Sequence, residues 1–365
     1  MLFPVTTCPR LVIKIGSALL VDANGVRRDW LASLAADIAA RCRDGQQVAV
    51  VSSGAIALGA RRLGLTKGGR ASLEDAQAAA ATGQIALAGT WAEVLAAEGL
   101  TAAQMLVTLD DLEDRRRYLN AAATLDRLLG LGVVPVINEN DSVATEEIRF
   151  GDNDRLAARV GVACGAGGVV LLSDVDGLYD RNPALPGAMH LSDIARIDAR
   201  VEAMADTGSA SGMGSGGMVS KLAAARIATQ AGVALAIASG RVERPLAGDV
   251  RHTLFRAAGR AGARRAWLAG RLAPRGTITV DAGAAKALRG GGSLLAAGAT
   301  ATEGRFARGD LVSIEGPDGP VAHGLSEYDA ADARRLLGRR SDEHAALLGH
   351  APRAALVHRS HMVLL

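Results

Sequence analysis

Over the first 250 residues, short apolar runs rich in β-branched side chains alternate with longer alanine- and leucine-rich stretches. The short runs predict strands, and the longer stretches, whose apolar residues have helical spacing, predict helices. Strands are expected at 11–15, 48–51, 133–137, 169–172 and 233–238, and helices at 29–43, 55–63, 73–98, 114–129, 154–164 and 218–231. Continuous apolar strands separated by helices predict an α/β fold, with a mostly parallel sheet sandwiched between helices and complete by about Ala238.

The pattern changes after about residue 272, where short strands are separated by Gly, Pro and Asp turns. Strands at 277–280, 309–314 and 320–325, a helix at 328–337 and a closing strand at 354–358 predict a small β-rich domain. The arginine-rich segment 256–275 marks the boundary. We therefore expect a first domain at 1–258, a linker at 259–275 and a C-terminal domain at 276–365.

Composition limits the classes of protein that fit. The chain has 365 residues, of which 49% are hydrophobic, and this is enough for a large core and a second domain. It contains no run of about 18 apolar residues and no recognisable signal peptide, so we expect neither a membrane span nor export. Three widely spaced cysteines, Cys8, Cys42 and Cys164, fit reduced thiols of a cytoplasmic protein better than disulfides or a metal site.

Lysine is rare in this chain, because 37 of the 41 basic residues are arginine. Lys14 lies near the end of the first predicted strand, two residues before Gly16, and Lys221 follows the glycine-rich segment 211–220. A lysine is a slender, rotatable point charge, which suits a transferring phosphoryl group better than a planar guanidinium does. The two positions indicate a phosphate clamp, although chance placement explains the lysines alone about equally well.

Two further polar turns follow predicted strands directly. Ser52-Ser53-Gly54 leads into a helix, and its hydroxyl and N–H groups suit a carboxylate or phosphate, although an ordinary helix cap by Ser52 or Ser53 explains this motif alone better. Ser173-Asp174 suits a ribose, a phosphate or a metal-bound water, or else forms a surface turn. Ligands of parallel sheets bind beyond the carboxyl ends of the strands, which is where both turns are expected.

Acidic and amide side chains are concentrated between residues 138 and 154. Asn138-Glu139-Asn140-Asp141 follows a predicted strand, and Gly151-Asp152-Asn153-Asp154 opens the next helix. Acids this close repel one another unless ammonium groups, lysines or a metal neutralise them. Capping of its helix by Asp154 would explain that one residue but not the others.

The chain lacks both G-x-x-x-x-G-K-[ST] and G-x-G-x-x-G, which argues against a P-loop or a dinucleotide fold. The ordered motifs K-I-G-S, V-S-S-G-A-I, N-E-N-D-S-V, F-G-D-N-D, L-L-S-D-V-D-G-L-Y and S-G-M-G-S-G-G-M-V-S-K-L resemble the amino acid kinase family. The resemblance is strongest to its members that phosphorylate glutamate. It covers essentially the whole chain, because the region after residue 272 resembles the PUA domain that many bacterial members carry.

The resemblance implies roles by position. Lys14 and Lys221 match phosphate-facing catalytic lysines, and Asp154 matches the acid that holds both in place. Positions that match substrate contacts are Ser53, Gly54, Asn138, Asp141 and Asn153. Positions that match ATP contacts are Lys14, Gly16, Ser173, Asp174, Ser215, Gly216, Gly217, Met218, Val219, Ser220 and Lys221. Serine stands at 17, 173, 215 and 220, where threonine is common, and it keeps the hydroxyl.

The implied activity is ATP-dependent phosphorylation of the γ-carboxylate of L-glutamate to L-glutamyl 5-phosphate, the first step of proline biosynthesis. The resemblance also implies Mg²⁺ as a cofactor, feedback inhibition by proline, a homo-oligomer and hand-off to glutamyl phosphate reductase. A carboxylate acceptor has a pKa of about 4.3 and is already ionised at neutral pH, so no catalytic base is needed. This agrees with the lack of histidine and cysteine in the motifs.

Two other classes of protein remain open. The basic segment 256–275 and the PUA-like region would suit an RNA-binding or RNA-modifying protein, but that reading leaves the kinase motifs unexplained. RNA that elutes with the purified protein and is lost at high salt would favour it. A catalytically silent amino-acid sensor on a kinase fold is the second alternative, and the presence of Lys14, Asp154 and Lys221 argues against it.

Overall fold

The computed structural model describes residues 8–22, 25–143, 152–206, 217–248, 250–257, 274–350, 352–353 and 355–365. The chain forms two compact units, which are treated separately below. The N-terminal unit comprises Met1–Glu113 and Ala121–Ala258, and the C-terminal unit comprises Asp114–Asn120 and Gly259–Leu365. In the described ranges, no helix is both long and apolar enough to cross a membrane.

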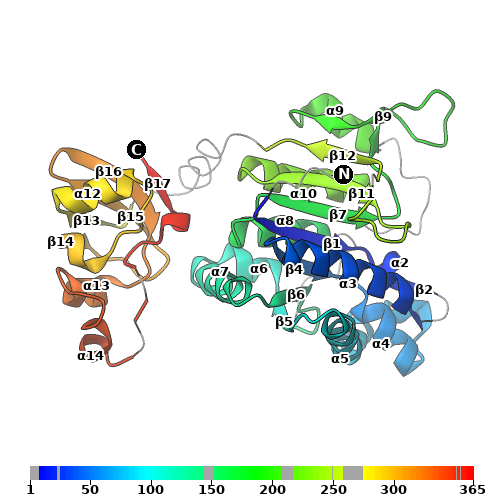
Figure 1. Ribbon diagram of the computed structural model, residues 1–365, viewed down its shortest axis with the longest axis horizontal. Helices are drawn as coiled ribbons and strands as arrows, with labels where there is room; N and C mark the ends of the chain where they lie inside the picture. Colours follow the sequence, from blue (N-terminus) through cyan, green and yellow to red (C-terminus); the bar gives the residue numbers. More distant parts are fainter. Residues whose placement is uncertain are drawn as a thin grey trace. The chain divides into compact units, whose positions relative to one another are not determined.

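An eight-stranded sheet forms the centre of the N-terminal unit, in the order β10-β12-β11-β7-β1-β4-β6-β5 (Figure 1). All neighbouring strands are parallel except β11 and β12, which are antiparallel. The strands are β1 (Arg10–Ile15), β4 (Gln47–Ser52), β5 (Ala102–Val107), β6 (Val134–Glu139), β7 (Gly168–Ser173), β10 (Asp193–Ile194), β11 (Ala234–Ser239) and β12 (His252–Phe255). Two short ribbons lie outside this sheet: β2 (Val21–Asp22) with β3 (Gly25–Val26), and β8 (Leu178–Tyr179) with β9 (His190–Leu191).

Helices cover both faces of the sheet, each over its own apolar cluster. One cluster contains buried side chains of α3 (Arg28–Arg43), α4 (Ala55–Leu63) and α5 (Leu73–Ala97). The other contains side chains of α6 (Leu109–Glu113), α7 (Arg115–Gly130), α8 (Asp152–Ala163), α9 (Ala199–Asp206) and α10 (Met218–Gln230). The described helical segments of this unit also include the short α2 (Ser17–Leu20) and the 3₁₀ turn η1 (Thr66–Gly69).

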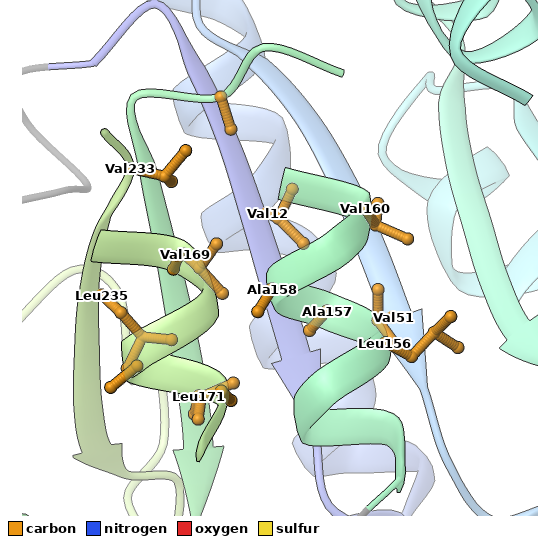
Figure 2. Close-up of a cluster of buried hydrophobic side chains, with 14 of the residues drawn as sticks. Val12, Val51, Leu156, Ala157, Ala158, Val160, Val169, Leu171, Val233 and Leu235 are labelled. Atoms are coloured by element: carbon orange, nitrogen blue, oxygen red, sulfur yellow. The ribbon is translucent and has the colours of Figure 1, made fainter. Parts of the chain in front are cut away.

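The alternation of side chains along β1 decides which residues meet which helices. Leu11, Ile13 and Ile15 pack in the cluster with α3 and α5, whereas Val12 packs in the cluster with α8 and α10. Figure 2 shows this second cluster, which contains Val12, Val51, Val169, Leu171 and Leu235 of the sheet and Leu156, Ala157, Ala158 and Val160 of α8. Lys14 is two residues beyond Val12, so it points to the same face.

The central strands end together at one edge of the sheet. In the parallel register, Ile15 of β1 lies beside Ser52 of β4 and Leu172 of β7. The pairing continues past the strands, since Ser53 N–H donates to the Ile15 carbonyl at 3.2 Å and Gly16 N–H donates to the Leu172 carbonyl at 3.3 Å. The turns that follow β1, β4 and β7 are therefore side by side.

The α/β fold and five strands expected from the sequence are confirmed, within one or two residues at each end. The expectation that the sheet is complete by Ala238 is wrong, because β12 extends it and β10 pairs with β12. β5 was not predicted either. These are short or edge strands with one less buried face, so they carry polar residues such as Gln104 and His252 that weaken the apolar pattern.

The C-terminal unit is built around a five-stranded sheet in the order β14-β13-β15-β16-β17. Its strands are β13 (Gly276–Val280), β14 (Ala299–Gly304), β15 (Leu311–Gly316), β16 (Gly319–Leu325) and β17 (Met362–Leu364). The helical segments are α12 (Ala282–Arg289), α13 (Ala330–Leu336), α14 (His344–Leu348), η2 (Ala296–Gly298) and η3 (Arg359–His361). Its buried apolar side chains form one cluster of its own.

The β-rich character of this unit is confirmed, and β13, β15, β16 and α13 match expected elements. The strand expected at 354–358 is wrong: Val357 forms only an isolated bridge with Leu294, and the closing strand is β17. β14 and α12 were not predicted, because their alanine-rich sequences fit neither pattern strongly. Residues 259–273 of the expected linker lie outside the described residues, so the boundaries 1–258, 259–275 and 276–365 stay predictions.

Candidate active site

Three charged side chains meet inside the N-terminal unit, on the face of the sheet that α8 and α10 cover. Lys14 Nζ lies 2.5 Å from Asp154 Oδ1, and Lys221 Nζ donates to Asp154 Oδ2 at 3.0 Å. Asp154 is fully buried, while Lys14 and Lys221 are 7% and 5% exposed. The carboxylate thus holds one ammonium group on each of its oxygens.

Each of these residues comes from an element that ends or begins at the same sheet edge. Lys14 is the penultimate residue of β1, Asp154 is the third residue of α8, and Lys221 is in the first turn of α10. Because Asp154 is inside α8 and both its oxygens face lysines, its role is not to cap that helix. The N-terminal turns of two helices add N–H dipoles that favour an anion at this edge.

Burial and charge act in opposite directions on the ionisation of this cluster. Burial is the largest influence on Lys14 and lowers its pKa, helped by the Lys221 charge and opposed by Asp154. For Asp154, burial is again the largest single influence and acts to raise its pKa. The two ammonium groups together outweigh it, so the pKa of Asp154 lies below its ordinary value and the carboxylate stays ionised.

A second group of polar residues lies beside the cluster, where β4 passes into α4. Asn153 Nδ2 donates to Ser53 Oγ at 3.0 Å, which joins the turn after β4 to the start of α8. Gly54 precedes α4 with φ of +110°, a left-handed conformation that favours glycine. The turn therefore presents the Ser53 hydroxyl and backbone N–H groups of the α4 N-terminus at the sheet edge.

The N-E-N-D turn at the end of β6 contributes buried polar groups. Asn138 is 4% exposed, and its Oδ1 accepts the N–H of Glu139 at 2.9 Å. Asp141 is 8% exposed, and Asn140 N–H donates to the Val107 carbonyl at 3.0 Å, which ties the turn to β5. Residues 144–151, including the acids Glu146 and Glu147, lie outside the described residues.

The positions expected to contact ATP lie at the ends of β1 and β7 and at the start of α10. Ser173 is 6% exposed and its Oγ donates to Asp174 Oδ1 at 3.1 Å, while Asp174 itself is exposed. Gly217 is the N-cap of α10, and Met218, Val219 and Ser220 form its first turn with Lys221. Ser215 and Gly216 lie outside the described residues, and their roles stay predictions.

Comparison with known proteins agrees with this geometry. The sequence model of the amino acid kinase family matches residues 9–239, and that of the PUA domain matches residues 276–348. The chain belongs to the amino acid kinase family.

Relatives of this amino acid kinase match it from end to end. It is 75% identical over 366 residues to glutamate 5-kinase of Sphingopyxis alaskensis, with 100% of both chains covered. It is 64% identical over 365 residues to glutamate 5-kinase of Novosphingobium aromaticivorans, with 99% of this chain and 97% of the relative covered. The structure of carbamate kinase from Giardia lamblia bound to AMP-PNP shares the fold, with a TM-score of 0.50 at 16% identity over 68% of this chain and 99% of that chain.

Three residues near the site of this amino acid kinase were not identified from the sequence. Arg70 is half-buried near Asp141: burial lowers the pKa of its guanidinium, and the Asp141 charge opposes that shift. Trp91 and Gln84 on α5 donate to Ser52 Oγ at 2.9 Å and to the Glu139 carbonyl at 3.4 Å. In the sequence, Gln84 and Trp91 stand out only as two side chains with polar groups inside the alanine-rich stretch 76–91. Helical spacing alone does not show which groups they contact.

Proposed function

We propose that this protein transfers the γ-phosphoryl group of ATP to the γ-carboxylate of L-glutamate, giving L-glutamyl 5-phosphate and ADP in the first step of proline biosynthesis. The observation that carries this proposal is the buried Lys14–Asp154–Lys221 cluster in a chain that matches glutamate 5-kinases over its whole length. Phosphoryl transfer needs concentrated positive charge and positioning more than covalent chemistry by the protein.

The reaction needs no general base. The acceptor carboxylate is ionised at neutral pH, and one of its oxygens attacks the γ-phosphorus while the bond to the β-phosphate oxygen breaks and its electron pair leaves with ADP. The main obstacle is the approach of one anion to another. Lys14 and Lys221 supply positive charge to the transferring group, and Asp154 fixes both ammonium groups without reaching the substrate itself.

The acceptor amino acid would occupy the polar groups around β4 and β6. The Asp141 carboxylate suits the substrate ammonium group, since a charged pair at a buried position gives a strong hydrogen bond. Ser53, Gly54, Asn138 and Asn153 suit its remaining polar ends. Arg70 lies near Asp141, and its guanidinium group suits a substrate carboxylate.

ATP would occupy the neighbouring edge, from Gly16 and Ser173-Asp174 to the start of α10. Among the described residues, no three His, Cys, Asp or Glu side chains gather to hold a metal ion by themselves. Mg²⁺ that arrives with the nucleotide would take most of its ligands from phosphate oxygens and water, and the exposed Asp174 carboxylate would be a protein ligand for it. When bound, Mg²⁺ would neutralise charge on the β- and γ-phosphates.

A release assay for ADP tests the proposal. We expect wild-type protein with ATP and Mg²⁺ to release ADP with glutamate and far less with aspartate, N-acetylglutamate or carbamate. Asp141→Asn should raise the glutamate KM strongly and leave the ATP KM near normal, because the substrate ammonium loses its counter-charge. Release with every acceptor equally, or with none, would contradict the function, and the latter is what a silent sensor would give.

Regulation and assembly are finer parts of the same proposal. Proline has the same α-amino acid head group as glutamate, so a proline site that overlaps the glutamate site would make the proline IC₅₀ rise with glutamate. Activity that is indifferent to millimolar proline would remove the inhibitor but not the kinase. We further propose a cytoplasmic homo-oligomer that hands its unstable acyl phosphate to glutamyl phosphate reductase.

A further inference from the structure

Helix α5 donates hydrogen bonds to the ends of β4 and β6, where the two turns of the proposed acceptor site begin. The Trp91 indole N–H donates to Ser52 Oγ, directly before Ser53, and Gln84 Nε2 donates to the carbonyl of Glu139 within the N-E-N-D turn. Gln84 and Trp91 are seven residues apart, which is two helical turns, so they lie on the same side of α5. One helix face therefore reaches the ends of β4 and β6 together.

The position of α5 is fixed by backbone contact with α4. A Cβ atom at Gly83 would overlap the carbonyl oxygen of Ala55, and one at Gly59 would overlap the carbonyl oxygen of Ala79. Only glycine allows the helices to approach this closely, and Figure 1 shows α4 and α5 side by side. Because α4 begins directly after Gly54, Gln84, which follows Gly83, is held in a fixed relation to the turn after β4.

One half of the Gln84 carboxamide has no partner. The side chain is 9% exposed, and Oε1 is buried, yet no donor reaches it in the part of the chain that the structure describes. The orientation of the amide is set by chemistry, because the Glu139 carbonyl can only accept and so must face Nε2. A buried acceptor without a donor is unfavourable, which points to a donor brought by a ligand.

The chemistry of the proposed acceptor identifies that donor. At neutral pH, free glutamate has two carboxylates, which only accept hydrogen bonds, and one ammonium group, which only donates. We propose that Gln84 is a further substrate-binding residue, whose Oε1 accepts an N–H of the α-ammonium group while Nε2 stays on the Glu139 carbonyl. This inference rests on the proposed function, and it places a neutral acceptor beside the Asp141 carboxylate.

Gln84→Met tests the inference, since methionine has a similar length and volume but makes no comparable hydrogen bond. We expect the glutamate KM to rise by about 10- to 100-fold, as for loss of a hydrogen bond to a charged group, with the ATP KM nearly unchanged. The Tm of the ligand-free protein should change little, because loss of the hydrogen bond from Nε2 to the Glu139 carbonyl is offset by removal of an unsatisfied buried acceptor. A lower Tm with an unchanged glutamate KM would show a purely structural residue and overturn the inference.

Glutarate, which lacks the α-amino group, separates an ammonium contact from a general disturbance of the site. Gln84→Met should leave the Ki of glutarate against glutamate near its wild-type value, and an equal loss for both ligands would overturn the inference.

Thr90→Val is the matched control. Thr90 is buried on the same helix at 4% exposure, and its hydroxyl donates only within α5, to the Ala86 carbonyl at 2.9 Å. It should leave both KM values unchanged. If the wild-type protein shows no glutamate-dependent ADP release, the proposed function and this inference are both wrong. If the wild type is active and Gln84→Met has a wild-type glutamate KM, the inference alone is wrong.

Discussion

Each unit of this protein buries a carboxylate among cations, and the two sites differ in geometry. In the N-terminal unit, Asp154 is fully buried, with ammonium nitrogens 2.5 and 3.0 Å from its two oxygens. In the C-terminal unit, Glu327 is 8% exposed, with an imidazole nitrogen of His361 at 3.4 Å and guanidinium nitrogens of Arg308 at 3.6 Å and Arg353 at 3.7 Å. In both, burial raises the carboxyl pKa, and the neighbouring groups outweigh it and lower the pKa.

The difference shows why a lowered pKa does not by itself identify a catalytic site. Glu327 follows an antiparallel strand and pairs with two guanidinium groups, which suit fixed structural contacts. The Asp154 cluster lies where parallel strands end and helices begin, and its partners are two of the four lysines in the chain. An ammonium group has three N–H donors, so it can hold a carboxylate and still contact a phosphate. Location and the type of cation, rather than burial, distinguish the two sites.

Asp154→Asn should have the largest effect. It leaves two buried ammonium groups without their counter-charge, which costs about 3–5 kcal/mol of folding free energy when one partner of a buried pair is removed. Turnover should fall by at least about 100-fold, because the lysines lose the group that orients them. ADP release and a thermal melt measure the two effects. Asp29→Asn, at an exposed position, is the control, and an Asp154→Asn enzyme with normal turnover would contradict the role given to the cluster.

Lys14→Arg and Lys221→Arg should each lower kcat by about 100-fold or more, with a smaller change in glutamate KM. The guanidinium keeps the charge but cannot place it where the buried ammonium group lies. Lys286→Arg makes the same substitution at an exposed position of α12 and should change neither kcat nor Tm. If either active-site variant kept near wild-type turnover, the phosphate-clamp interpretation of the lysines would be wrong.

Glu327→Gln should separate stability from catalysis. It should destabilise the C-terminal unit by about 1–3 kcal/mol, because Arg308, Arg353 and His361 lose a charged partner. Turnover of the folded protein should stay within about twofold, because the kinase motifs lie in the other unit. Calorimetry and ADP release measure these effects, with the exposed Glu315→Gln as control. A loss of turnover in Glu327→Gln without a loss of stability would contradict this prediction, because Glu327 would then act in catalysis as Asp154 does.

The pH dependence of this variant sharpens the same test. The pKa of Glu327 is lower in the folded protein, so the folded state favours the ionised form. Its stabilising contribution is therefore complete above the unfolded-state pKa of about 4.3 and is lost as the pH falls below it. Wild-type protein should lose more stability than Glu327→Gln in that acidic window. Parallel pH profiles for the two proteins would show that Glu327 contributes no charge-dependent stability.

The sequence was informative where one motif carried both structure and chemistry. Lys14 and Lys221 drew attention because each lies beside a glycine-rich turn, and the roles of both lysines and of Asp154 followed from the resemblance to the amino acid kinase family. Gln84 could not be identified, because one amide in an alanine-rich helix gives no sign of the backbone carbonyl it will meet. That contact depends on the glycine-mediated approach of α4 and α5, which is a tertiary property. Strands β5, β12 and β17 were missed for a related reason, since edge strands such as β5 and β17 and a short strand such as β12 are defined by their neighbours.

Removal of the C-terminal residues should have the smallest effect on catalysis. A chain that ends within 260–275 keeps every described element of the eight-stranded sheet, including β12, and the whole Lys14–Asp154–Lys221 cluster. Each unit has its own apolar clusters, so the truncated protein should fold and retain glutamate-dependent ADP release within about twofold, with changes confined to proline response, oligomer stability or metal dependence. The cut also separates Asp114–Asn120 from the rest of the C-terminal unit, and aggregation would mean that it exposes apolar surface. Soluble protein with a cooperative melt but no activity would be the decisive contrary result, because it would give the C-terminal unit a part in the active site.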